Sequence, residues 1–164
     1  MKVLVLYYSK GGNTRKLAQA VEAGVNSVSG VTAVLRDTES VTKEDFLEAD
    51  GIVAGSPVYF GTMAAPLKSI FDNFVSTRRK MEGKVGAAFA TSGHPTGGKE
   101  TTMMSIIQAL LIYGMVIVGD PMDASGHYGT ACAGAPDAPI LEEGEKLGRR
   151  VAEVTLKQIG RAHV

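Results

Sequence analysis

The stretch Val3-Leu4-Val5-Leu6-Tyr7-Tyr8-Ser9-Lys10-Gly11-Gly12-Asn13-Thr14 carries apolar and aromatic strand formers directly into a small, polar, glycine-rich turn. A helical pattern follows at once, over about residues 13–28. A strand, a tight loop and a helix N-terminus in this order present backbone N–H groups to an anion, and the helix dipole favours negative charge there. Ser9, Asn13 and Thr14 add short hydrogen-bonding side chains, and Asn13 or Thr14 can also serve as the helix N-cap. The stretch therefore predicts a phosphate site.

The rest of the chain alternates short apolar runs with helical patterns. Further strands are expected at 31–35, 50–57, 84–90 and 115–118, and further helices at 42–49, 65–75, 99–113 and 140–159. Residues 76–83 are expected to be a polar connection, and residues 119–139 a long loop that is either functional or mobile. Five strands alternating with five helices predict one α/β domain over residues 1–164, with a parallel sheet between two helical layers.

Composition excludes several classes of function. The 164 residues include 17 basic and 17 acidic side chains, so the zero net charge argues against a nucleic-acid partner and against an acidic electron carrier. A single cysteine, Cys132, leaves no disulfide framework and no cysteine-based metal site, and we expect no metal. No apolar run is long enough to span a bilayer, and no signal-peptide pattern is present. We therefore expect a cytoplasmic protein without membrane insertion.

Three loops follow predicted strands at the edge where ligands bind in doubly wound sheets. The first contains Ser9, Lys10, Gly11, Gly12, Asn13 and Thr14, and it matches neither a Walker loop nor a dinucleotide fingerprint. The second is aromatic and contains Pro57, Val58, Tyr59, Phe60 and Gly61. The third is rich in small residues and contains Thr91, Ser92, Gly93, His94, Thr96 and Gly97. A phosphate cradle, an aromatic wall and a backbone-rich loop together suit a phosphorylated planar heterocycle.

Several motifs resemble one known family. Residues 8–14 look like the phosphate loop of flavodoxin-like proteins. Residues 55–63 with 66–72 resemble the second flavin loop and helix of the WrbA-type NAD(P)H:quinone oxidoreductases, and residues 91–101 are similar to that family's next loop. Tyr113-Gly114-Met115-Val116-Ile117-Val118 and His127-Tyr128-Gly129-Thr130 resemble two later segments. The resemblance covers nearly the whole chain, and its motifs fall in the family's order.

This resemblance implies a flavodoxin-like three-layer α/β/α sandwich with strand order 2-1-3-4-5 and non-covalent FMN. The three loops and Tyr113 would contact FMN, with the phosphate in the first loop and the ring beside the second. NAD(P)H would be the electron donor and a quinone the small-molecule acceptor, in a homo-oligomer, either a dimer or a tetramer. The alternative is a flavodoxin that carries electrons between redox proteins, and a weaker one is an interaction protein that merely keeps the fold.

Several of the candidate site residues also have simpler, purely structural interpretations. Ser9, Asn13 and Thr14 could be no more than a helix cap, Tyr59 and Phe60 could be core residues, and His94 could be a solvent-facing loop residue. His127, from the long loop, is the candidate catalytic residue, as a proton donor to reduced quinone that would reach the site within one chain or only in an oligomer. Cys132 is expected to be inert.

Overall fold

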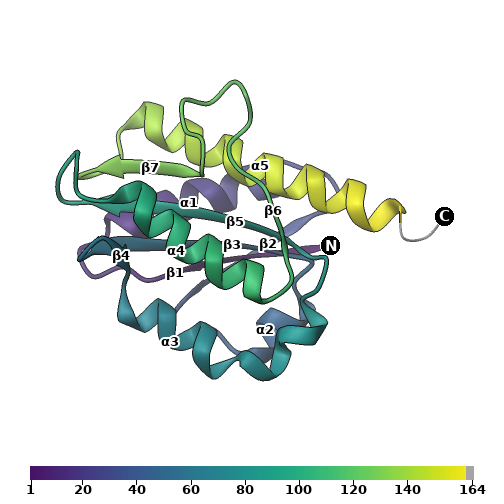
Figure 1. Cartoon of the computed structure of the whole chain (residues 1–164). Coiled ribbons are helices and arrows are strands. Elements are labelled where there is room, and N and C mark those ends of the chain that lie inside the picture. The colour runs from purple at the N-terminus through teal and green to yellow at the C-terminus, as the bar shows by residue number, and fades with distance from the viewer. Residues whose placement is uncertain (162–164) are drawn as a thin grey trace.

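The computed structural model describes residues 1–161, which form a central sheet with helices on both faces (Figure 1). The strands are β1 (Lys2–Tyr7), β2 (Thr32–Asp37), β3 (Gly51–Tyr59), β4 (Thr62–Met63), β5 (Val85–Ser92), β6 (Val116–Ile117) and β7 (Thr130–Ala133). The helices are α1 (Asn13–Asn26), α2 (Lys43–Glu48), α3 (Ala65–Asn73), α4 (Lys99–Ile112) and α5 (Ala138–Arg161), with a 3-10 helix η1 (Val75–Lys80). Among the described helices, none has the length and apolarity needed to cross a membrane.

The sheet has the predicted topology. Its five main strands are parallel and lie in the order β2-β1-β3-β5-β6, which is the 2-1-3-4-5 order of the five expected strands. The predicted α/β/α sandwich is therefore confirmed. The connection at 76–83 was predicted to be irregular, but most of it belongs to η1, where the side chain of Thr77 donates a hydrogen bond to the carbonyl of Phe74.

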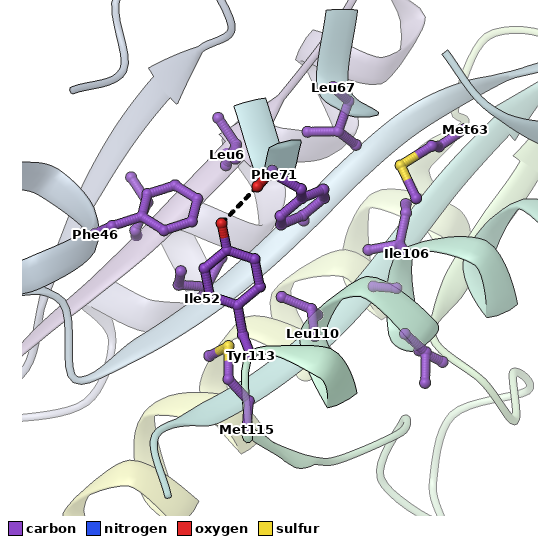
Figure 2. Packing of buried hydrophobic residues seen from close by; sticks show 14 of the residues in the cluster. Leu6, Phe46, Ile52, Met63, Leu67, Phe71, Ile106, Leu110, Tyr113 and Met115 are labelled. Atoms are coloured by element: carbon purple, nitrogen blue, oxygen red, sulfur yellow. Dashed lines mark hydrogen bonds between the residues drawn. The ribbon is translucent and has the colours of Figure 1, made fainter. Parts of the chain in front are cut away.

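The apolar alternation along β1 explains the two cores. Val3, Val5 and Tyr7 point to the face that α1 and α5 cover, whereas Leu4 and Leu6 point to the face under α2, α3 and α4. Successive side chains of a strand point to opposite faces, so a fully apolar strand is stable only between two helical layers. Figure 2 shows the second core, where rings and aliphatic chains from α2, α3 and α4 meet above β1 and β3.

The fifth strand of the sheet is split. β6 pairs with the first residues of β5, and β7 pairs with residues 89–92 along the same edge of β5. The chain leaves the sheet between them, over residues 118–129. The expected loop at 119–139 was thus partly wrong: it contains a four-residue strand whose small side chains, Thr130-Ala131-Cys132-Ala133, carry too weak a pattern to be recognised.

Candidate functional site

The carboxyl ends of β1, β3 and β5 bring the three predicted loops together. The backbone N–H of Tyr8 donates to the carbonyl of Gly55 over 3.1 Å, which joins the first loop to the second strand end. The hydroxyl oxygens of Thr14 and Thr91 lie 2.8 Å apart and both side chains are buried, which joins the first loop to the third. The three loops therefore lie together at one edge of the sheet, as the sequence predicts.

The first loop ends in an open helix N-terminus. Residue Gly12, at a left-handed φ of 91°, is the N-cap of α1, and no side chain caps the first turn. The expectation of Asn13 or Thr14 as cap was wrong, because both already lie inside the helix. Ser9 Oγ instead accepts a hydrogen bond from the Gly12 N–H over 3.1 Å and shapes the turn. The free N–H groups of this turn, with the dipole behind them, suit a phosphate.

The second loop is a tight hairpin between β3 and β4, in which Tyr59 pairs with Thr62. Its turn residue Phe60 has a φ of 52°, a backbone conformation that costs a bulky side chain energy, and its ring is fully exposed. Buried Ser56 holds the base of the loop, since its hydroxyl accepts from the Ala64 N–H and donates to the Pro57 carbonyl. A rigid base thus presents an aromatic ring to solvent.

The third loop is held in shape by hydrogen bonds to the backbone carbonyl and the ring of His94. Ser92 Oγ and the Gly97 N–H both donate to the His94 carbonyl, over 2.7 and 3.0 Å, and the Thr96 N–H donates to His94 Nδ1. The imidazole of His94 is exposed, and its role as a turn-forming acceptor was missed from the sequence. The loop therefore keeps its shape without help from a ligand.

The N-terminus of α4 completes the site. Like α1, this helix starts after a left-handed glycine, Gly98 at a φ of 99°, and no side chain caps its first turn. A Cβ on Gly98 would lie 3.1 Å from the Cα of Gly61, so the second and third loops are in close contact. Two uncapped helix N-termini thus face the same edge of the sheet.

These residues fit FMN. The backbone at Gly11, Gly12 and Gly93 borders open space, since a Cβ at any of the three would meet no protein atom within 4 Å. Open space thus borders the first and third loops, and at the second loop the Phe60 ring is fully exposed and Tyr59 partly so. A doubly ionised phosphate and a flat aromatic ring are the two groups such a cradle accommodates.

Tyr113 does not belong to this site. It lies at the end of α4, just before β6, and β6 pairs with the beginning of β5, whereas the site lies beyond the end of β5. Its hydroxyl donates to the carbonyl of Phe71 over 2.6 Å, and its ring packs between Phe46 and Phe71 (Figure 2). Burial raises the pKa of Tyr113 to about 12. The predicted FMN contact by Tyr113 is corrected to a role in the core.

His127 also lies away from the three loops. The backbone of Gly129 packs against the Ala88 carbonyl, four residues before Ser92 along β5. At ~3.3 Å per residue this places the segment roughly 13 Å short of the strand end. The imidazole is exposed. Within one chain, the structure does not bring this predicted catalytic residue to the flavin loops.

A buried carboxyl near His127 was missed from the sequence. Asp120 follows β6, and its Oδ1 accepts a 3.4 Å hydrogen bond from Thr130, whereas its Oδ2 has no partner among the described residues and abuts the backbone of Gly126. Burial is the largest cause that raises the pKa of Asp120 to about 6. A lone Asp in a glycine-rich segment reads as a turn residue, which hides this environment.

A polar cleft of about 250 Å³ lies beside the first loop. It is bordered by Lys10 and Arg15 on one side and by Asp37 and Glu39, at the end of β2, on the other. The Asp37 carboxylate accepts hydrogen bonds from Ser40 and from the Glu39 N–H, which lower its pKa. The cleft was not predicted, because the second strand was expected to end at residue 35, whereas β2 continues to Asp37. Among the described residues, no group of three His, Cys, Asp or Glu side chains is placed to hold a metal.

The topology and the three-loop cradle define a flavodoxin-like protein. The family model described as NADPH-dependent FMN reductase matches residues 1–129, and the chain belongs to this family. It is therefore a flavin-dependent oxidoreductase by family, as predicted, and FMN and NAD(P)H are the expected cofactor and donor.

Three known proteins illustrate the likeness. The chain is 38% identical to a flavodoxin of Aquifex aeolicus over 159 residues, covering 93% of this chain and 85% of that one. It is 34% identical to an NAD(P)H dehydrogenase (quinone) of Archaeoglobus fulgidus over 187 residues, covering 95% and 98%. A solved structure, the flavodoxin, WrbA-like protein from Agrobacterium tumefaciens, superposes with a TM-score of 0.83 at 23% identity, covering 96% and 98%. The resemblance to the WrbA-type proteins is confirmed.

Proposed function

We propose that the chain, as a single domain over residues 1–164, is an NAD(P)H:quinone oxidoreductase that holds FMN in the cradle of its three loops. The balanced reaction is NAD(P)H + H⁺ + quinone → NAD(P)⁺ + hydroquinone. The observation that carries the proposal is the contact of three loops from distant parts of the sequence, seen most directly in the Thr14–Thr91 hydroxyl pair. The quinone dehydrogenase name of the Archaeoglobus relative supports the choice of acceptor.

The roles of the loops follow from their chemistry. Residues 11–14 and the N-terminus of α1 would hold the phosphate, and Ser9 would keep the turn closed. Val58, Tyr59 and Phe60 would flank the ring, and the backbone of residues 91–97 would meet its polar edge. Lys10 is exposed at the rim and would add positive charge near the phosphate. When bound, the flavin supplies a ring that can take a hydride from NAD(P)H and pass two electrons on.

The protein itself contributes position more than proton transfer. In the described cradle, His94 Nδ1 is hydrogen-bonded to Thr96, Lys10 lies at the phosphate end, and the other polar side chains are hydroxyls and amides without strong acid or base character. Proton delivery to the reduced quinone would then come from solvent, or from His127 of a neighbouring subunit if the protein assembles. The residues of the cradle would hold the ring in a fixed orientation toward both substrates.

We further propose a homo-oligomer, either a dimer or a tetramer, in the cytoplasm, where NAD(P)H is produced. The support is an exposed apolar surface on one edge of the sheet, where Leu111 of α4 and Val116 of β6 are both about half exposed. Exposed apolar side chains next to an uncovered edge strand favour association with another chain.

A second candidate is a flavodoxin-type carrier, which is favoured by the name of the Aquifex relative. Steady-state turnover separates the two. We expect the FMN-loaded protein to consume NADH or NADPH with benzoquinone far faster than the same concentration of free FMN. Turnover no faster than that of free FMN, by protein that retains its FMN, would favour the carrier.

A further inference from the structure

An apolar groove of about 950 Å³ runs between α3, η1 and α4, on the face opposite α1 and α5. Its floor is made by the buried side chains of Met63, Phe71 and Tyr113, which Figure 2 shows in the core beneath it. Its rim carries the exposed side chains of Val75 and Ile112. A cleft of this size with mostly apolar walls is typical of small-molecule sites.

The groove starts at the flavin cradle. Tyr59 and Phe60, which form the predicted wall of the flavin site, also line one end of the groove. From there the groove follows α4 from Ser105 to Ile112, which at ~1.5 Å per residue is roughly 10 Å. A molecule whose ring lies at Phe60 could therefore extend a chain along the groove.

The polar side chains deep in the groove are hydrogen-bonded within the protein, whereas Thr62 and Gln108 lie exposed at its edge, and this distribution indicates what kind of chain fits. Ser105 Oγ accepts from the Met63 N–H and donates to the Thr102 carbonyl, and the Tyr113 hydroxyl donates to Phe71. Of the charged groups, Lys68 pairs with Asp72 at 2.7 Å, and exposed Arg78 donates from its Nε to the Ile112 carbonyl at the edge of the groove. Among the described residues that line the groove, no buried polar side-chain atom lacks a partner, so the interior of the groove favours an apolar occupant.

We propose that this groove binds the hydrocarbon side chain of a lipid-type quinone whose ring reacts at the flavin cradle. The inference rests on the proposed quinone reductase function and specifies its substrate class. The driving force is burial of apolar surface, which grows with each methylene that enters the groove. A short quinone such as benzoquinone would use the cradle alone, whereas a tailed quinone would use both.

The test compares two quinones with one ring, a dimethoxy-methyl-benzoquinone that carries either hydrogen or a decyl chain at its free position. With the FMN-loaded protein, the KM for the decyl quinone is expected to be at least about ten-fold lower, which corresponds to about two buried methylenes. The Ala109→Phe variant places a ring in the groove and should abolish this difference without changing the KM of the short quinone. Gln108→Trp is a second groove variant in case Ala109→Phe folds poorly.

Ala23→Phe is the matched control, because Ala23 is exposed on α1 across the sheet and should leave both constants unchanged. Equilibrium dialysis of the decyl quinone without NAD(P)H gives a second readout that does not depend on turnover. Tight binding of the decyl quinone that Ala109→Phe weakens supports the groove even if neither quinone is reduced, in which case the proposed function alone fails.

Two results would overturn the groove proposal while the function stands. One is turnover of both quinones with equal KM in the wild-type protein and equal binding in dialysis. The other is a change of sedimentation from oligomer to monomer in Ala109→Phe, with the preference for the decyl quinone intact. That second result would assign the groove to contact with another copy of the chain.

Discussion

The hydroxyl oxygens of Thr14 and Thr91 lie 2.8 Å apart in the buried centre of the cradle, although 77 positions separate the two residues in the sequence. Thr14 belongs to the first turn of α1, and Thr91 belongs to the carboxyl end of β5. The pair fixes the phosphate loop relative to the loop that would meet the polar edge of the ring. Its loss should therefore affect FMN more than the fold.

The first prediction concerns this pair. Thr14→Val and Thr91→Val keep the shape of the side chains but remove a hydroxyl, and each should weaken FMN binding roughly ten-fold, as for loss of one hydrogen bond. The measurement is FMN titration of the apoprotein. Thr155→Val is the control, because Thr155 is a buried threonine of α5 whose hydroxyl donates to the Val151 carbonyl of its own helix. Unchanged FMN affinity in both cradle variants would remove the pair from the site.

The second prediction tests whether the open space at Gly93 belongs to the ligand. Gly93 has no positive φ, and a Cβ there meets no protein atom within 4 Å, so Gly93→Ala should leave the melting temperature of the apoprotein nearly unchanged. The same methyl group should weaken FMN binding by a factor of ten or more, on the order of 1–3 kcal/mol for overpacking. A variant that binds FMN as well as wild type would show that the ring does not approach this loop.

The third prediction separates strain from contact at Phe60. Phe60→Gly and Phe60→Ala both remove the exposed ring, and both should reduce turnover. Only glycine relieves the left-handed backbone at a φ of 52°, so Phe60→Gly should unfold with a free energy about 1 kcal/mol higher than that of Phe60→Ala. Urea unfolding of the two apoproteins measures this difference. Equal stability would mean that the loop relaxes when the ring is gone.

The fourth prediction uses the buried Asp120. Its pKa in the folded state is about 6, above the ordinary value of 3.8, so the folded state holds the proton more tightly than the unfolded state. Stability is then highest at low pH with respect to this group, and it falls as the pH rises from about 4 to about 6. Asp120→Asn should therefore stabilise the protein at pH 8, by up to ~3 kcal/mol.

That gain should shrink when unfolding is measured at pH 5, where the wild-type carboxyl is largely protonated in the folded state. The exposed Asp123, in the same loop, provides the control variant Asp123→Asn, which should show no comparable gain. A stabilisation by Asp120→Asn that is the same at both pH values would contradict the role of charge burial.

Much of this molecule could be predicted from local patterns. The apolar run from Val3 to Leu6, followed by a glycine-rich turn and a helical pattern, predicted the first strand of an α/β sheet. The cradle was predictable because its loops follow β1, β3 and β5, and parallel strands end at one edge of a sheet. Those inferences depend only on periodicity and topology.

The rest depended on packing that no local pattern carries. The resemblance predicted that Tyr113 contacts FMN, but its ring is buried in the core, where the Phe71 carbonyl accepts a hydrogen bond from its hydroxyl. Strand β7 is made of small residues that pair only because β5 is already in place. Asp120 is buried by the loop that follows it in the chain. No short segment of sequence shows that this loop folds back over the carboxyl group.

The most direct test of the central claim is an anaerobic half-reaction experiment with the FMN-loaded protein. Addition of NADH or NADPH is expected to bleach the visible flavin absorbance rapidly, and a stoichiometric amount of benzoquinone is then expected to restore it at once. Flavin that neither nicotinamide reduces, or reduced flavin that benzoquinone reoxidises no faster than in a protein-free control, would contradict the assignment as an NAD(P)H:quinone oxidoreductase.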